Sequence, residues 1–222
     1  KSTLLHLIGG VDRPTSGKIF VDGNDISKMN DDKLAVFRRR QVGIVYQFYN
    51  LIPILTVEEN ITLPCDLDGR GVDRERLEMI LDSFGLRARR KHLPNQLSGG
   101  QQRRVAFAGV LAMRPTTLVL DEPVAGLDPA SRADFLSLIE DLHTHHGLTV
   151  VMVSHNMNDI ARLADRLLVM HEGEVAFLGS PEELFTKHAV ELREIGLGIP
   201  HAQRLANELR ELGFDSVSYT HL

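Results

Sequence analysis

Two neighbouring carboxylates, Asp121 and Glu122, are the residues of this sequence best suited to chemistry. They follow the nearly continuous apolar run 117–120, which is typical of a buried parallel strand. A carboxylate at the carboxyl end of such a strand can hold the water shell of Mg²⁺, and its neighbour can accept a proton from an attacking water. A strand that merely ends in an acidic turn is the alternative, and the apolar run before the pair with Pro123 after it argues against that.

Phosphate-binding groups are expected at Lys1, Ser2 and Thr3, which open a predicted short helix that glycines end. Phosphate binding uses backbone N–H groups at a helix start, a lysine for the β- and γ-phosphates, and a hydroxyl on Mg²⁺, here that of Ser2. The three residues match the end of the phosphate-loop pattern, Gly-Lys-Ser/Thr, without its glycines. Alone they are a weak signal, because a surface Lys-Ser pair also occurs at helix starts.

A glycine-rich turn, Ser98-Gly99-Gly100-Gln101, precedes a helix that is predicted to stop before Pro115. Because two positions lack side chains, the backbone there can approach a γ-phosphate, and the helix dipole would face it. A plain glycine turn is the alternative.

Two more polar residues stand at the ends of predicted strands. Gln47 ends the predicted strand 41–47, and His155 follows the predicted strand 149–153. Ligands of parallel α/β sheets bind at the carboxyl ends of the strands. Gln47 could reach Mg²⁺ or the attacking water there, and His155 could hydrogen-bond the γ-phosphate. Each is a weak signal alone, since a lone histidine is more often structural.

The elements that must position these residues alternate between strand and helix, which predicts an α/β fold with a mostly parallel sheet. Residues 18–23 and 166–177 are predicted to form hairpins. The helix-rich stretch 57–104, broken near Pro64 and near residues 69–71, would be a subdomain, and the helices after Pro181 an appendage.

Composition excludes several classes of function. The chain has 222 residues, 43% of them hydrophobic, and a net charge of -5, so no overall basic field exists to hold nucleic acid. The single cysteine, Cys65, excludes an internal disulfide framework. No apolar run approaches the roughly 18 residues that a membrane span needs, so a partner would have to cross any membrane that the protein serves.

Six motifs, taken in order, resemble those of the ABC ATPases. The end of Walker A, the Q-loop, the signature, Walker B, the D-loop and the H-loop correspond to Lys1-Ser2-Thr3, Gln47, Leu97-Ser98-Gly99-Gly100-Gln101, Leu118-Val119-Leu120-Asp121-Glu122-Pro123, Ala125-Gly126-Leu127-Asp128 and Ser154-His155. The resemblance implies a P-loop NTPase domain over residues 1–185 with a helical signature subdomain at about 57–104, and it leaves 186–216 as a C-terminal helical appendage. The combination is specific because all six motifs occur in order.

The resemblance also implies a function: ATP hydrolysis that drives transport through transmembrane permease subunits at the cytoplasmic face of the cell membrane. Two ATPase subunits, identical or different, would form a head-to-tail dimer that closes on ATP and opens after hydrolysis. The implied cofactors are ATP and Mg²⁺, and no nucleic acid is expected as a partner.

The implied roles fall into three groups. Catalysis would use Glu122, His155 and Gln47. The metal would be held by Ser2, Gln47 and Asp121. ATP would lie between Lys1, Ser2 and Thr3 of one subunit and Ser98, Gly99, Gly100 and Gln101 of the other, with Asp128 contacting the facing subunit.

Two departures from the family pattern concern the N-terminus, where the adenine-stacking aromatic residue and the phosphate-loop glycines are absent. We therefore expect an N-terminally truncated chain that binds nucleotide poorly and is inactive by itself, unlike its parent protein. Residues 217–222 match one frame of a transposon end used in sequencing libraries and are expected to be a non-native tail, with a frayed polar tail as the alternative.

The branch of the family differs between the two halves of the chain. Residues 11–17 and 46–53 look like the macrolide-export and lipoprotein-release branch, whereas residues 108–115 and 154–161 look like energy-coupling-factor and cobalt-type importers. The switch falls at 97–104, where the branches share residues. A chimera, natural or from assembly of mixed reads, is one hypothesis.

Other functions and smaller features remain open. An ABC-type ATPase of DNA repair or translation is the alternative to transport, although no heptads or second domain appear. Residues 48–53 could be core or an apolar interface for the membrane subunit. The basic run 87–91 reads as a solvated helix end rather than a lipid or nucleic-acid site, and the histidines 143, 145 and 146 lack partners at metal-ligand spacing.

Overall fold

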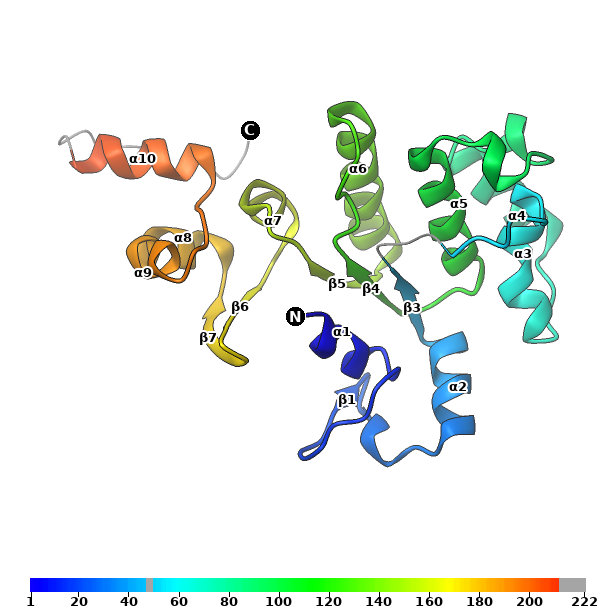
Figure 1. Cartoon of the computed structure of the whole chain (residues 1–222), viewed down its shortest axis with the longest axis horizontal. Coiled ribbons are helices and arrows are strands. Elements are labelled where there is room, and N and C mark those ends of the chain that lie inside the picture. Colours follow the sequence, from blue (N-terminus) through cyan, green and yellow to red (C-terminus); the bar gives the residue numbers. More distant parts are fainter. Residues whose placement is uncertain (47–49, 212–222) are drawn as a thin grey trace. The chain divides into compact units, whose positions relative to one another are not determined.

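The computed structural model describes residues 1–46 and 50–211. These residues form two compact units (Figure 1). Of the described residues, those between Ser2 and Val153 form the large unit, and Lys1 with residues 154–211 forms the small unit. The predicted domain boundary near residue 185 stays a prediction.

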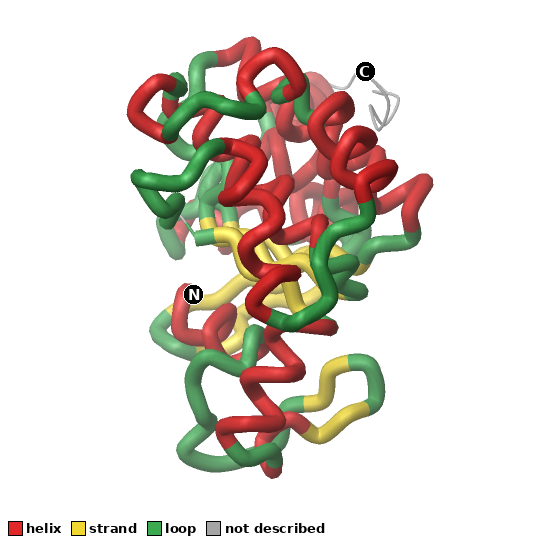
Figure 2. Tube along the Cα trace, turned by 90° about the vertical axis from the view of Figure 1, so that its right-hand side faces the viewer, coloured by secondary structure: helices red, strands yellow, loops and turns green. Residues whose placement is uncertain are grey.

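A parallel three-stranded sheet forms the centre of the large unit. Its strands β3 (Val42–Val45), β4 (Thr117–Asp121) and β5 (Thr149–Val153) lie in the order β3-β4-β5. The first four residues of β4 are buried, as the apolar run predicted. Figure 2 shows the strands in yellow among helices, and in Figure 1 the helices α1 and α2 lie on one side of the sheet and α5 and α6 on the other.

The N-terminal part of the large unit packs on one face of this sheet. Helix α1 (Ser2–Ile8), the short hairpin of β1 (Phe20–Val21) and β2 (Asn24–Asp25), and helix α2 (Asp31–Arg40) supply apolar side chains that pack on the sheet. The buried members of this cluster are Leu5, Ile26, Leu34, Phe37, Val42 and Val119. Gly10 ends α1 with a φ of 65°, which confirms the predicted glycine stop.

The predicted helical stretch contains α3 (Val57–Leu67), α4 (Arg74–Ser83), the 3-10 turns η2 (Arg87–Arg89) and η3 (Pro94–Gln96), and the start of α5 (Gly99–Ala112). The predicted break at residues 69–71 is confirmed, because Gly69 and Gly71 have positive φ. The predicted break near Pro64 is wrong, since Pro64 lies inside α3. Buried side chains on both sides of it, Ile61 and Cys65, hold the helix in place across the missing hydrogen bond.

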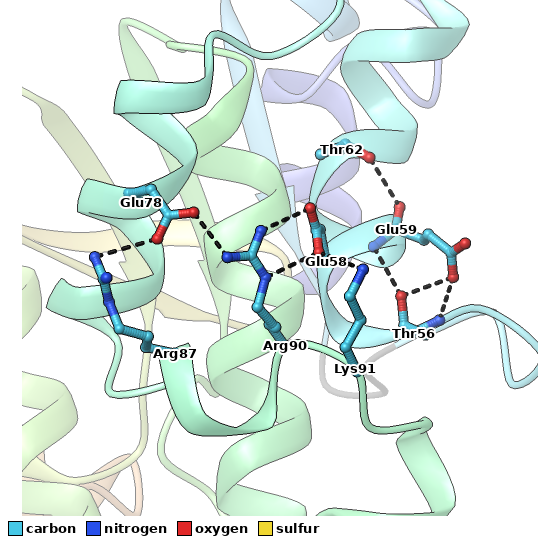
Figure 3. A network of polar contacts seen from close by, with 8 residues as sticks. All are labelled: Thr56, Glu58, Glu59, Thr62, Glu78, Arg87, Arg90 and Lys91. Carbon is cyan, nitrogen blue, oxygen red and sulfur yellow. Dashed lines mark hydrogen bonds and ion pairs between the residues drawn. The ribbon is translucent and has the colours of Figure 1, made fainter.

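Ion pairs join the start of α3 to the segment that follows α4 (Figure 3). Arg90 donates to both carboxylate oxygens of Glu58, at 3.0 and 2.9 Å, and to Glu78 at 2.8 Å. Hydrogen bonding to Arg90 lowers the pKa of Glu58 to about 2. Lys91 also pairs with Glu58, and Arg87 with Glu78. The basic run is thus bound largely to carboxylates of its own subdomain.

Helix α6 (Pro129–His146) follows β4 and completes the large unit. Its Phe135 packs against Phe107 of α5 with ring centroids 5.0 Å apart, and Phe107 also contacts Phe84 at 5.8 Å. Gly147 ends the helix in the left-handed conformation. The aromatic contacts fix α6 on the same helical layer as α5.

The small unit has its own core. It contains α7 (Met157–Leu163), the antiparallel pair β6 (Leu167–His171) and β7 (Glu174–Gly179), and the helices α8 (Pro181–Lys187), α9 (Ala189–Glu194) and α10 (His201–Glu211). The buried members of its hydrophobic cluster are Met157, Ile160, Val169, Leu184, Phe185 and Leu192. Within residues 1–46 and 50–211, no helix is long and apolar enough to cross a membrane.

Close packing between β3 and α5 depends on a glycine. A Cβ atom at Gly43 would lie 2.2 Å from Cγ1 of Val110 and 3.1 Å from Cγ of Pro115. A side chain at this position would force α5 away from the sheet, and with it the glycine-rich turn at the start of α5.

We therefore predict that Gly43→Ala lowers the free energy of unfolding by about 1–3 kcal/mol, the usual cost of overpacking a core. Gly198→Ala is the matched control, because no described residue other than its chain neighbours comes within 4 Å of a Cβ at Gly198. Urea denaturation measures both variants. Equal midpoints for the two would contradict the packing argument.

Candidate functional site

The central strand delivers the two carboxylates to one edge of the sheet. Asp121 is the last residue of β4 and pairs in register with Val153 of β5. The N–H group of Glu122 donates to the Val153 carbonyl at 3.0 Å, and Glu122 has a φ of 49°. A glutamate in the left-handed region is uncommon and persists only where its surroundings hold it. The chain therefore turns sharply at Glu122.

The loop between Glu122 and α6 is held from both sides. Within it, the N–H group of Ala125 donates to the Glu122 carbonyl at 3.1 Å. From outside, the guanidinium of Arg103 donates to the Ala125 carbonyl at 2.9 Å. Asp128 then caps α6 by accepting a hydrogen bond from the Ser131 N–H group at 3.0 Å, and the hydrogen bonds from Ser131 hold the pKa of Asp128 below its usual value.

The glycine-rich turn begins α5 with a reciprocal cap. Ser98 accepts from the Gln101 N–H group at 3.3 Å, and the Gln101 side chain accepts from the Ser98 N–H group at 3.0 Å. A Cβ at Gly100 would lie 3.7 Å from Leu127 and Ser131, which is ordinary contact, and its φ is not in the left-handed region. Among the described residues, nothing near Gly100 therefore requires a glycine.

The predicted phosphate-loop residues Ser2 and Thr3 are exposed at the first turn of α1. Leu5, in the same helix, packs in one cluster with Val119 of β4. Ser2, Thr3 and the Asp121–Glu122 pair thus belong to the same compact unit, and their meeting in a single site stays a prediction.

Comparison with known proteins decides between the possible families. The family model described as ABC transporter matches residues 1–125. The chain belongs to the ABC transporter ATP-binding family. It is an ATPase whose hydrolysis is coupled to transport, and ATP is its nucleotide. This match supports transport and not the alternative role in DNA repair.

Relatives of this ABC ATPase cover almost the whole chain. The energy-coupling factor transporter ATP-binding protein EcfA2 of Symbiobacterium thermophilum is 46% identical over 218 residues, which is 96% of this chain and 74% of that protein. The protein of the same name from Clostridioides difficile is 41% identical over 221 residues, which is 97% of this chain and 76% of that protein.

Solved cassettes share the fold. A dimeric ATP-binding cassette, MJ0796, in a post-hydrolysis state bound to ADP and Pi, matches with a TM-score of 0.74 and 38% identity over 81% of this chain and 80% of the other. A further dimeric structure of MJ0796 matches with a TM-score of 0.73 and 37% identity, with the same coverage. The predicted P-loop NTPase fold of the α/β class is confirmed.

The position of three predicted site residues of the ATPase relative to Asp121 stays a prediction. Gln47 lies outside the described residues. Lys1 and His155 belong to the small unit, so their approach to Asp121 stays a prediction. His155 is exposed between Ser154, whose hydroxyl accepts from the Asn156 N–H group, and the start of α7.

A residue that the sequence analysis missed, Asn60, organises the segment after the Q-loop. Its side chain is 8% exposed and donates to the carbonyls of Ile52, Leu55 and Thr56 at 2.9–3.2 Å, while accepting from the Ile52 N–H group at 2.8 Å. An amide on the otherwise apolar buried face of α3, next to Ile61, was the available signal. Asn60 closes the segment 52–56 into a fixed turn.

Apolar side chains on that turn are exposed. Ile52 is 40% and Ile54 81% exposed, and Pro53 is also at the surface. These residues are not core, so of the two alternatives for this segment the interface gains support. Phe48 and Tyr49 lie outside the described residues.

Gly100 supplies a test of the site. We predict that Gly100→Ala leaves the free energy of unfolding unchanged within about 0.5 kcal/mol, because a methyl group fits, but that it lowers ATP hydrolysis at least about tenfold by blocking close approach of a phosphate. Urea denaturation and an ATPase assay, in protein carrying a whole phosphate loop before Lys1, measure the two effects. A destabilised variant, or one with full activity, would show that the glycine has another purpose.

Proposed function

We propose that this chain is an ATP-hydrolysing subunit of an energy-coupling factor transporter. Relatives of that description align over 95–97% of its length at 39–46% identity. The observation that carries the proposed ATP hydrolysis is the turn at Glu122. This glutamate directly follows Asp121, the last residue of the central strand, and its backbone is in the left-handed conformation.

The proposed nucleotide site is shared between two copies of the cassette arranged head to tail. Lys1, Ser2 and Thr3 of one copy would hold the phosphates from one side. Ser98, Gly99, Gly100 and Gln101 of the other copy would meet the γ-phosphate, and Asp128 would contact the facing copy. The glycine at position 100 supports this arrangement, because a Cβ there would meet only ordinary contacts among the described residues, so packing in its own chain does not require a glycine.

A magnesium ion fits the donors of the large unit. The Asp121 carboxylate at the sheet edge and the Ser2 hydroxyl at the start of α1 are oxygen groups of the kind that Mg²⁺ prefers, with Gln47 as the third proposed donor. When bound, the ion would neutralise charge on the phosphates. Its remaining positions would be filled by phosphate oxygens and water.

The proposed chemistry is attack of water on the γ-phosphate. Glu122 orients the water and takes its proton, while His155 hydrogen-bonds the γ-phosphate and Gln47 helps position the water. Backbone hydrogen bonds on both sides of Glu122 support this role, because a general base must be held within reach of the proton that it removes.

We further propose that the turn at residues 52–54 contacts the membrane-embedded permease subunits and transmits to them the conformational change that accompanies ATP hydrolysis. An exposed apolar turn fixed by Asn60 is suited to receive a partner segment. The ATPase would then sit peripherally at the cytoplasmic face of the membrane, held there by the permease.

The proposed base gives a direct prediction. Glu122→Gln should lower hydrolysis by about 100-fold or more, the usual share of a general base. It should also trap ATP in a closed dimer, since the amide keeps the shape and loses the basicity. Nucleotide content and size-exclusion chromatography with ATP measure this, in protein with a whole phosphate loop.

Glu172→Gln is the matched control, because Glu172 also has a φ of 49° and lies exposed in the turn between β6 and β7. It should leave turnover unchanged. Unchanged turnover in Glu122→Gln would reject Glu122 as the base.

A further inference from the structure

Arg103 is a buried charge in the first half of α5. Its residue is 3% exposed, and its helix neighbours Val105 and Phe107 are fully buried. A guanidinium inside a protein is costly unless hydrogen bonds compensate it, so its position needs a reason beyond packing. It stands one helical turn after Gly100, the residue proposed to meet the γ-phosphate of the facing copy.

One hydrogen bond of Arg103 reaches the loop between Glu122 and α6. Its Nη2 atom donates to the Ala125 carbonyl at 2.9 Å, and the Ala125 N–H group donates to the Glu122 carbonyl at 3.1 Å. Ala125 therefore joins Arg103 on one side to Glu122 on the other. The N–H group of Glu122 is meanwhile fixed on β5 by the Val153 carbonyl at 3.0 Å.

The start of α5 lies beside the end of this loop. A Cβ at Gly100 would lie 3.7 Å from Leu127 and from Ser131, so these two side chains are neighbours of Gly100 at the end of the loop and the start of α6. The hydrogen bond from Arg103 to Ala125 is a direct contact through which a displacement of α5 would reach residues 122–128.

We propose that Arg103 is a positioning residue, which ties the signature helix to Ala125 and so makes the placement of Glu122 depend on the placement of α5. This inference rests on the proposed function, in which Glu122 is the base of one site and the start of α5 meets the nucleotide of the other. Engagement of α5 by one ATP then sets the geometry of the base at the neighbouring site.

The test compares two arginines of the large unit that donate to backbone carbonyls, the buried Arg103 and the half-buried Arg76. Arg103→Gln should lower kcat for ATP about 10- to 100-fold while KM changes less than about threefold, because a positioning contact acts on the transition state and not on nucleotide binding. Arg76→Gln is the matched control, since Arg76 donates to the Leu111 carbonyl at 2.7 Å at the far end of α5. Arg76→Gln should also lower the free energy of unfolding, but it should leave kcat for ATP unchanged.

Arg103→Lys keeps the charge and a donor, and it should fold and show a kcat between those of the wild type and Arg103→Gln. If Arg103→Gln does not fold, the kcat of Arg103→Lys tests the proposal instead. Wild-type kcat in a folded Arg103→Gln or Arg103→Lys protein, or an equal loss of kcat in Arg76→Gln, would overturn the proposal.

The trapped state separates this inference from the proposed function. In the Glu122→Gln background, Arg103→Gln should still trap ATP in the dimer, because nucleotide binding does not require the hydrogen bond between Arg103 and Ala125. Failure of Glu122→Gln alone to trap ATP would count against the proposed function. Normal trapping together with normal hydrolysis in Arg103→Gln would count against the inference only.

Discussion

Four residues of β4, 117–120, are buried between β3 and β5, so the first carboxylates after them can emerge only at the carboxyl edge of the sheet. The rest of the large unit is arranged around that constraint. Helix α1 packs on one face of β4 through Leu5, which puts the predicted phosphate-binding turn in the same compact unit. Helix α5 packs on β3, where Gly43 permits close approach. The sheet thus positions groups from three separate stretches of sequence.

Helix α5 has contacts of two kinds, and together they explain its composition. Its first turn, at Ser98 and Gly100, is capped and unencumbered, as a surface that receives a phosphate must be. Its next turn contains Arg103, which holds the loop after Glu122. Its later turns pack on α3 and the sheet through apolar residues. A single rigid helix can therefore relate a nucleotide at its start to a base that belongs to a different site.

Apolar runs and glycine turns predicted most of the fold, because burial and positive φ have strong local signatures. β4, the left-handed Gly10 and the helix break at residues 69–71 are examples. Pro64 was wrongly predicted as a break, since tertiary packing of α3 outweighs one lost hydrogen bond. Asn60 was missed although an amide on an apolar helix face was a signal, and Arg103 was missed because a backbone carbonyl as partner carries no side-chain signal in a sequence. The Ala125 partner of Arg103 lies 22 residues away.

The central claim is that each ATP site combines the phosphate loop of one copy with the signature of another. Mixing two inactive variants, Lys1→Ala and Ser98→Arg, in protein with a whole phosphate loop tests it directly. In a head-to-tail dimer, a mixed pair has one site with both defects and one site with none, so ATP hydrolysis should return on mixing. If each site lies within a single chain, every site keeps one defect, and a mixture as inactive as its components would contradict the account.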